Sequence, residues 1–204
     1  MTQHSAACTH HHAGTAFSMK TVTLALMLAT SPSWVSGQAP LRAVIIVRHA
    51  EKASSPKENP PLSPAGAARA RALEEALRDA GVTTIITTEQ RRTQDTAAPL
   101  LSALHLDGVV VPTSPDRQHH ANAVAAAVRK AGGTVLVIDH QLTMPVIIAA
   151  LGGPSVQTVC DVEFSNLYIL LPADSSHLRL IRSHYGAPDP PHEAGCHISP
   201  VSPP

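Results

Sequence analysis

The stretch Ala43-Val44-Ile45-Ile46-Val47-Arg48-His49 decides the fold that we expect for this chain. A short, unbroken apolar run predicts a strand that is buried on both faces of a sheet. Arg48 and His49 follow the run directly, so a guanidinium and an imidazole stand at the carboxyl end of that strand. In open α/β sheets this edge is where ligands bind. Because a guanidinium offers a rigid fork of donors that fits phosphate, the stretch predicts a phosphate site.

Two more apolar runs end in groups of the same kind. The run at 82–86 precedes the segment Thr87–Ala97, which contains Arg91 and Arg92, and the run at 134–138 precedes His140. Three strand ends would therefore bring two arginines and two histidines to one rim. Such a set suits phosphoryl transfer, because catalysis of that reaction is mostly positioning and electrostatic stabilisation of the phosphoryl oxygens.

Predicted strands and helices alternate along most of the chain. We expect strands at 43–47, 82–87, 108–111 and 134–138, and a closing hairpin of strands at 166–171 and 177–182. Helical spacing of apolar residues and capping residues predict helices at 64–80, 92–104, 119–131 and 143–151. This alternation indicates an α/β fold, a single three-layer α/β/α domain with a mostly parallel sheet.

Length and composition set bounds on size and partners. The 204 residues are enough for one domain with a sizeable core, and with 44% apolar but only 2% aromatic residues that core is built from small aliphatic side chains. The formal net charge of zero gives no support to a nucleic-acid or anionic-membrane partner. A basic site in a neutral chain favours a small phosphorylated ligand. Composition does not predict the oligomeric state.

The first 37 residues resemble an N-terminal extension that ends in a signal peptide. Met19-Lys20 precedes the short apolar segment Thr21–Ala29, and Val35-Ser36-Gly37 has small residues at the cleavage positions. The alternative is a disordered, mildly apolar tail. We expect an exported protein, periplasmic or secreted and not inserted in the membrane after cleavage, with a domain at 38–185 and a Pro-rich tail at 186–204. Met19 is an alternative start.

Cysteine and histidine usage adds two weaker expectations. Cleavage after Gly37 would leave Cys160 and Cys196, which either form a disulfide or remain two unrelated thiols. The cluster His10-His11-His12 has a metal-binding composition, with His4 and Cys8 nearby. It lies before or within the segment that we expect to be removed, so we predict no metal site.

Four stretches carry a resemblance to a known family: Ile46–Lys52, Pro61–Gly66, Arg91–Ala97 and Thr134–Pro145. Because these four stretches occur in this order, the chain from about residue 41 to about residue 185 resembles the histidine phosphatase superfamily, in its phosphoglycerate mutase-like phosphatase branch. The resemblance implies a phosphoric monoester or phosphoramidate hydrolase that needs no cofactor. It implies that His49 is the nucleophile, which becomes phosphohistidine, and that Arg48, Arg92 and His140 line the phosphate pocket. The family pattern favours Arg92 over Arg91, because Thr93 and Thr96 then fall in register.

The chain departs from the family around His140 and in its general acid. Relatives commonly read Gly-His-Ser-Asn-Thr where this chain has Asp139-His140-Gln141-Leu142-Thr143, and Asp139 could orient His140 or raise its pKa. Where the acid phosphatase branch has an Asp, this chain has Gln141. The region that matches the mutase branch offers Asp116, His119 and His120 as possible acids, with no clear Glu. By proximity alone, Glu51, Asp139 and Glu163 are also possible.

Two other functions stay open at this stage. A non-catalytic or weakly catalytic binding module for a phosphorylated ligand would keep Arg48, Arg92 and His140 but lack an acid. A phosphomutase usually needs a longer acid-bearing loop than the segment 112–118 provides, and export argues against it as well. An acid-poor site favours substrates with good leaving groups, such as phosphoramidates or acyl phosphates.

Overall fold

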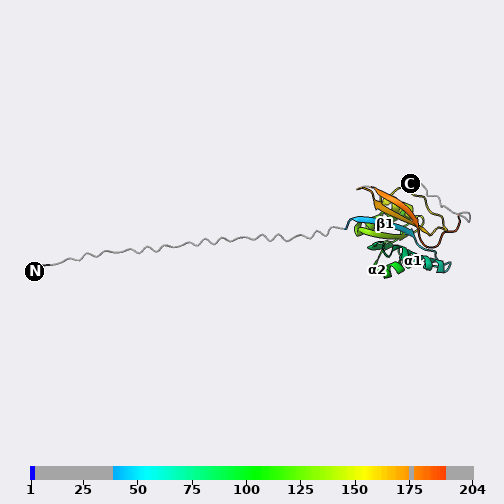
Figure 1. The fold of residues 1–204 in the computed structure, drawn as a ribbon, viewed down its shortest axis with the longest axis horizontal. Helices are drawn as coiled ribbons and strands as arrows, with labels where there is room; N and C mark the ends of the chain where they lie inside the picture. The colour runs from blue at the N-terminus through cyan, green and yellow to red at the C-terminus, as the bar shows by residue number, and fades with distance from the viewer. Residues whose placement is uncertain (3–38, 175–176, 192–204) are drawn as a thin grey trace. The chain divides into compact units, whose positions relative to one another are not determined.

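The computed structural model of the chain describes residues 1–2, 39–174 and 177–191 (Figure 1). Its strands are β1 (Leu41–Arg48), β2 (Thr84–Thr87), β3 (Gly108–Val110), β4 (Gly133–Asp139), β5 (Asn166–Pro172) and β6 (Leu178–His184). Its helices are α1 (Pro64–Leu77), α2 (Arg91–Leu104), α3 (Arg117–Ala131) and α4 (Met144–Ala150). All the expected strands and helices are present, with boundaries that differ by a few residues. None of the described helices has the length and apolar character needed to cross a membrane.

The strands form one sheet in the order β3-β2-β4-β1-β5-β6. β3, β2, β4 and β1 run parallel to one another, whereas β5 is antiparallel to β1 and forms the predicted hairpin with β6. The sheet is therefore mostly parallel, as expected. In the register of the central strands Arg48 lies beside Asp139 and Thr87 beside Ile138, so the ends of β1, β2 and β4 meet at one edge.

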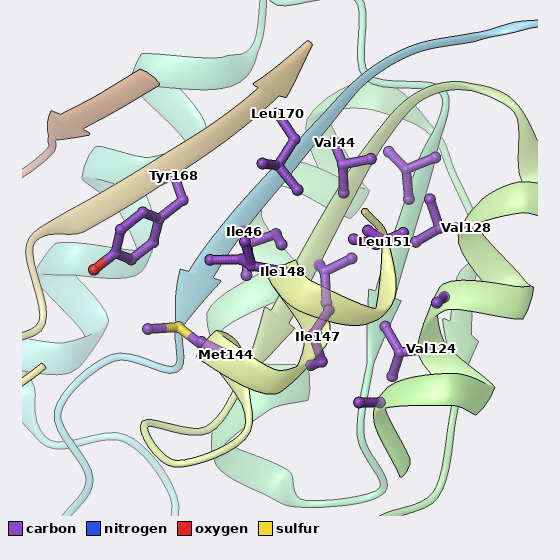
Figure 2. Packing of buried hydrophobic residues seen from close by; sticks show 14 of the residues in the cluster. Val44, Ile46, Val124, Val128, Met144, Ile147, Ile148, Leu151, Tyr168 and Leu170 are labelled. Atoms are coloured by element: carbon purple, nitrogen blue, oxygen red, sulfur yellow. The ribbon is translucent and has the colours of Figure 1, made fainter. Parts of the chain in front are cut away.

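Alternation along β1 divides the core into two layers. Val44 and Ile46 face α3 and α4, where they pack with Val128, Ile147 and Ile148 (Figure 2). Ile45 and Val47 point to the opposite face and pack in a second cluster with Leu73, Leu77 and Leu100 of α1 and α2. Because successive side chains of a strand point to opposite faces, one apolar run feeds both layers. The predicted three-layer α/β/α architecture is therefore confirmed.

Local chemistry sets the beginnings of the helices that flank the sheet edge. Ser63 caps α1, because its Oγ accepts a hydrogen bond from the backbone N–H of Gly66 at 3.1 Å and Pro64 occupies the first helical position. Asp116 caps α3, where its Oδ1 accepts from the N–H groups of Gln118 and His119 at 2.8 and 3.2 Å. Each cap satisfies donors that have no partner within the helix.

Several predictions lie outside the described residues. They concern the signal peptide, the histidine cluster at 10–12 and the cysteine Cys196. Cys160 is disulfide-bonded, and the predicted pairing with Cys196 stays a prediction.

Candidate active site

A cavity of about 820 Å³ opens at the sheet edge where β1, β2 and β4 end. The four side chains that sequence reasoning placed together all line it: Arg48, His49, Arg92 and His140. The other lining residues are Glu51, Lys52, Thr113, Ser114, Pro115, Arg117, His120, Gln141, Leu142, Thr143, Asp161 and Phe164. The residues come together because the ends of parallel strands meet at the same edge of a sheet.

His49 is a buried, neutral imidazole with one free nitrogen. Its side chain is 5% exposed, and its Nδ1 lies 2.8 Å from the carbonyl oxygen of Ala50. Since a carbonyl only accepts, Nδ1 bears the hydrogen and Nε2 keeps its lone pair. Burial lowers the pKa of His49 to about 3, and the positive charge of Arg48 adds to the effect, although the hydrogen bond to Ala50 opposes it. The imidazole is therefore neutral at physiological pH, as a nucleophile must be.

Arg48 is held by the loop that follows α4. Its Nη1 donates to the carbonyl oxygens of Cys160, Asp161 and Glu163 at 3.2, 2.8 and 3.0 Å. The ring of Phe164 lies 4.0 Å from the guanidinium carbon. Burial lowers the pKa of Arg48 to about 10, so the guanidinium stays charged at neutral pH. Its buried Nε has no hydrogen-bond partner among the described residues, so the group keeps a donor that an anion can satisfy.

Arg92 and His140 hydrogen bond to each other in the cavity. The Nη2 of Arg92 lies 3.4 Å from Nδ1 of His140, and Nε2 of His140 lies 3.1 Å from the hydroxyl of Thr88. Because a guanidinium only donates, Nδ1 of His140 accepts, and Nε2 carries the hydrogen. Burial lowers the pKa of His140 to about 4, with Asp139 opposing and Arg92 reinforcing the shift. Both pocket histidines are thus neutral, and their ring centroids lie 5.3 Å apart.

Threonines on α2 place Arg92 in the cavity and leave Arg91 outside it. The hydroxyl of Thr96 donates to the carbonyl of Arg92 at 2.7 Å and accepts from the N–H of Ala50 at 3.0 Å, which ties the helix to the chain after β1. Arg91 is exposed and pairs with Asp95 at 3.3 Å, one helical turn away. Arg91 is therefore a solvated charge at the start of the helix.

Each of the carboxylates named as a possible acid is already engaged. Glu51 lines the cavity, but Arg69 holds it with Nε at 2.9 and 3.1 Å from the two oxygens and Nη2 at 2.8 Å. Asp116 caps α3 and is not among the residues that line the cavity. Glu163 accepts from the N–H of Cys160 at 2.7 Å. Because these carboxylates already have partners among the described residues, none of them is arranged to protonate a leaving group.

Asp139 acts on His140 through its charge, which works to raise the pKa of that residue, and through a hydrogen bond to the backbone of His140, whereas the imidazole that it binds is that of His120. It is 1% exposed, and its Oδ2 lies 2.9 Å from Nε2 of His120, not from the ring of His140. Its Oδ1 accepts from the backbone N–H of His140 at 2.7 Å and from the hydroxyl of Thr143. Asp139 therefore fixes the turn that carries His140, whereas the imidazole of His140 is held by Thr88 and Arg92.

Sequence reasoning named His120 only as one of several possible acids, and the structure places it at this site as a buried partner of Asp139. It is 1% exposed, lines the cavity and hydrogen bonds to Asp139 and to the carbonyl of Pro112. Helical spacing contained the clue, because 120 is four residues before Val124 and eight before Val128, which both point inward. A histidine at that spacing belongs to the buried face of α3.

A comparison with protein families assigns residues 44–116 to the histidine phosphatase superfamily (branch 1). This segment contains Arg48, His49 and Arg92. The chain thus resembles the histidine phosphatase superfamily. No curated protein matches the chain.

Solved structures share this histidine phosphatase fold. A mycobacterial glucosyl-3-phosphoglycerate phosphatase is 18% identical, with 72% of this chain and 99% of that chain covered and a TM-score of 0.53. The protein histidine phosphatase SixA is 17% identical, with 70% and 96% covered and a TM-score of 0.53. A candidate alpha-ribazole-5'-P phosphatase from Escherichia coli K-12 is 15% identical, with 71% and 96% covered and a TM-score of 0.56. At these identities the likeness shows the fold alone, and with the family match it supports a phosphatase of this fold.

Proposed function

We propose that this protein is a phosphatase that hydrolyses a small phosphorylated substrate through a phosphohistidine intermediate on His49, without a metal ion. The observation that carries the proposal is the state of His49. Its Nδ1 is bound to the carbonyl of Ala50 at 2.8 Å, so a neutral Nε2 is left as nucleophile in a cavity that also contains Arg48 and Arg92. A buried neutral imidazole in a cavity that two guanidiniums also line is an arrangement suited to attack on a phosphorus atom.

The reaction would proceed in two displacements. In the first, the lone pair on Nε2 of His49 forms a bond to phosphorus, and the leaving group departs with the electron pair of its broken bond and takes up a proton from solvent. In the second, water attacks the phosphorus and loses a proton to solvent, the bond to Nε2 breaks and returns its electron pair to the imidazole, and inorganic phosphate leaves. The hydrogen bond from Nδ1 to Ala50 keeps the ring in the required tautomer throughout.

The cations of the site would hold the phosphoryl oxygens. Arg48 stays charged and has a buried, unpaired Nε among the described residues, and Arg92 would turn donors from His140 toward an incoming anion. His140 would contact the same oxygens. Neighbouring structures were solved with tungstate in SixA and with inorganic phosphate in the mycobacterial phosphatase. An oxyanion site is therefore a reasonable expectation for this fold.

The engaged carboxylates point to a preference in leaving group. Glu51, Asp116 and Asp139 each have partners, so a leaving group that departs without strong protonation is favoured. Phosphoramidates and acyl phosphates meet this requirement better than alkyl phosphates do. The same observation supports a second candidate, a module that binds a phosphorylated ligand and turns it over slowly.

Phosphate labelling of the purified domain tests both candidates. We expect wild type to incorporate acid-labile, base-stable phosphate from a phosphoramidate or acyl phosphate and to release inorganic phosphate. Both signals should vanish in His49→Ala and persist in His119→Ala, which removes an exposed imidazole from α3. Phosphate binding with neither labelling nor release would overturn the phosphatase and leave the binding module. Equal rates on alkyl phosphates and phosphoramidates would contradict the leaving-group preference.

Two further parts of the proposal concern where the protein works. We propose that residues 1–37 direct export and that the mature domain acts in the periplasm or outside the cell. A small phosphorylated substrate is the proposed partner. Cell fractionation with and without residues 1–37 tests export, and retention of the full chain in the cytoplasm would refute it.

A further inference from the structure

We propose that His120 and Asp139 form a buried imidazolium–carboxylate pair that positions His140 for the phosphoryl group. The inference rests on the proposed function, because it assigns a role to residues beside the same phosphate site. The two side chains come from different elements, His120 from the first turn of α3 and Asp139 from the last position of β4. Each is 1% exposed, so neither interacts with bulk water.

The hydrogen-bond partners of His120 fix its protonation state. Nδ1 lies 3.0 Å from the carbonyl oxygen of Pro112, and Nε2 lies 2.9 Å from Oδ2 of Asp139. A carbonyl oxygen can only accept, so Nδ1 bears a hydrogen, and a carboxylate oxygen likewise accepts. When Asp139 is the carboxylate, both ring nitrogens face acceptors and each holds a hydrogen, which is the imidazolium form. The geometry thus places a positive charge on His120 opposite the negative charge on Asp139.

The second oxygen of Asp139 connects this pair to the catalytic turn. Oδ1 accepts from the backbone N–H of His140 at 2.7 Å and from the hydroxyl of Thr143. His120 thereby links the segment at Pro112 to the end of β4 and, through Asp139, to the turn of His140. Removal of the Asp139 side chain would free that turn, and removal of the charge on His120 would leave Asp139 uncompensated. Both residues act through His140, so they are positioning residues.

The pair also cancels a charge that would weaken phosphate binding. An uncompensated carboxylate beside the cavity would repel a phosphoryl dianion in a region of low dielectric. The charged and titratable groups that act on His120 are Asp139 of β4, Glu89 after β2 and His140 after β4. The hydrogen bond that His120 donates to Asp139 is the main cause that raises the pKa of His120 above its usual value, against the opposing effect of burial.

The charge on His120 predicts an alkaline loss of phosphate affinity. Below its raised pKa, His120 is positive and balances Asp139. As the pH rises through that pKa, the pair becomes net negative and Nδ1 or Nε2 loses its hydrogen opposite an acceptor. Phosphate affinity should then fall, although His49 and His140 are already neutral and do not titrate in this range.

Nitrogen NMR of the ring and binding of inorganic phosphate test this inference. In wild type, the ¹⁵N shifts of His120 should show hydrogen on both nitrogens at pH 7. Calorimetric titration with inorganic phosphate from pH 6 to 9 should show an alkaline fall of affinity. Asp139→Asn keeps the size of the side chain but removes its charge, so this fall should be lost. His119→Asn, which alters the exposed neighbour on α3, should retain the alkaline fall of affinity. Because phosphate itself ionises alike with both variants, the difference between them reports on the pair of His120 and Asp139.

Asp139→Ala tests the positioning role separately. With the anchor of the His140 turn removed, we expect phosphate affinity to drop at least tenfold, with a circular dichroism spectrum like that of wild type. If this variant does not fold, the ¹⁵N shifts of the His120 ring in wild type and the pH dependence of phosphate affinity in Asp139→Asn still test the inference. A single ring hydrogen on His120 at pH 7, or an alkaline fall that persists in Asp139→Asn, would overturn the inference. Wild type that binds phosphate but makes no phosphohistidine would overturn only the proposed reaction.

Discussion

His49 and His140 show how burial prepares side chains for a reaction. Burial is the largest cause of the low pKa values of both residues, about 3 and about 4. Arg48 and Arg92 add to the effect, because a positive charge disfavours a second one nearby. The same residues that would bind the phosphoryl group thus keep both imidazoles neutral before it arrives.

These pKa values predict that acid destabilises the fold. In the unfolded chain a histidine titrates near 6.5, so between that pH and the folded values the unfolded chain binds more protons. The contribution of the two neutral histidines to the free energy of unfolding is complete above about pH 6.5. It is lost as the pH falls toward 4, by up to about 1.4 kcal/mol per pH unit for each histidine. Denaturant unfolding at pH 7 and pH 5 measures this loss. We expect a smaller loss in His49→Gln and His140→Gln than in wild type.

The exposed His119 provides the control for this measurement. His119→Gln should lose as much stability between pH 7 and pH 5 as wild type does, because His119 is exposed and is not among the residues that line the cavity. An equal loss in His49→Gln, His140→Gln and wild type would mean that the pocket histidines do not contribute to the acid sensitivity.

At the scale of the elements, α1 approaches the chain that leaves β1 closely. The backbone N–H of Ser63 donates to the carbonyl oxygen of Glu51 at 2.8 Å. A Cβ on Gly66 would overlap that same carbonyl oxygen. Glycine at 66 therefore serves a close approach of helix and loop, which brings Glu51 to Arg69 of the same helix.

We expect Gly66→Ala to move α1 away from the loop of Glu51. Alanine favours a helix by about 1 kcal/mol over glycine. However, the new Cβ would clash with the backbone carbonyl of Glu51, which cannot rotate away as a side chain can. The free energy of unfolding should therefore fall by about 2 kcal/mol or more, and phosphate affinity should fall with it. Ala68→Ser, which adds one atom on the exposed face of the same helix, is the control for denaturant unfolding. An unchanged free energy of unfolding in Gly66→Ala would show that the loop of Glu51 moves without an energetic cost.

At the scale of the molecule, the segment after β6 binds the loop that holds Arg48. Asp189 accepts from the N–H groups of Phe164 and Ser165 at 2.8 and 3.0 Å and from the Ser165 hydroxyl at 2.6 Å. The Nη1 of Arg69 donates to the carbonyls of Tyr185 and Ala187 at 3.1 and 3.0 Å. The first residues of the Pro-rich segment are therefore part of the support for the pocket.

Replacement of Asp189 should affect the pocket from a distance. Asp189→Ala leaves the N–H groups of Phe164 and Ser165 without their carboxylate, and hydrogen bonds to charged groups are worth about 1.5–3 kcal/mol. We expect a loss of about 2 kcal/mol in unfolding free energy and several-fold weaker phosphate binding, because Phe164 covers Arg48. Asp107→Ala, at an exposed position, is the control. Unchanged phosphate binding in Asp189→Ala would show that the loop holds Arg48 without this segment.

The sequence by itself determined the layers of the fold and four residues that line the cavity at the sheet edge. Apolar runs, helical spacing and caps such as Ser63 act within a few residues, so they can be recognised in a linear pattern. Arg48, His49 and His140 could be found because each stands at the end of an apolar run, and the ends of parallel strands share an edge. The choice of Arg92 over Arg91 came from the resemblance to the family.

Only the tertiary structure decided which groups pair with which. His120 meets Asp139 across 19 residues, Arg69 meets Glu51 across 18, and Arg48 meets the carbonyl of Asp161 across 113. Hydrogen bonds require contact within about 3 Å and a suitable angle, and no periodicity in the sequence encodes such a distance between remote segments. The tautomers, the engaged carboxylates and the imidazolium of His120 therefore emerge only when the layers pack.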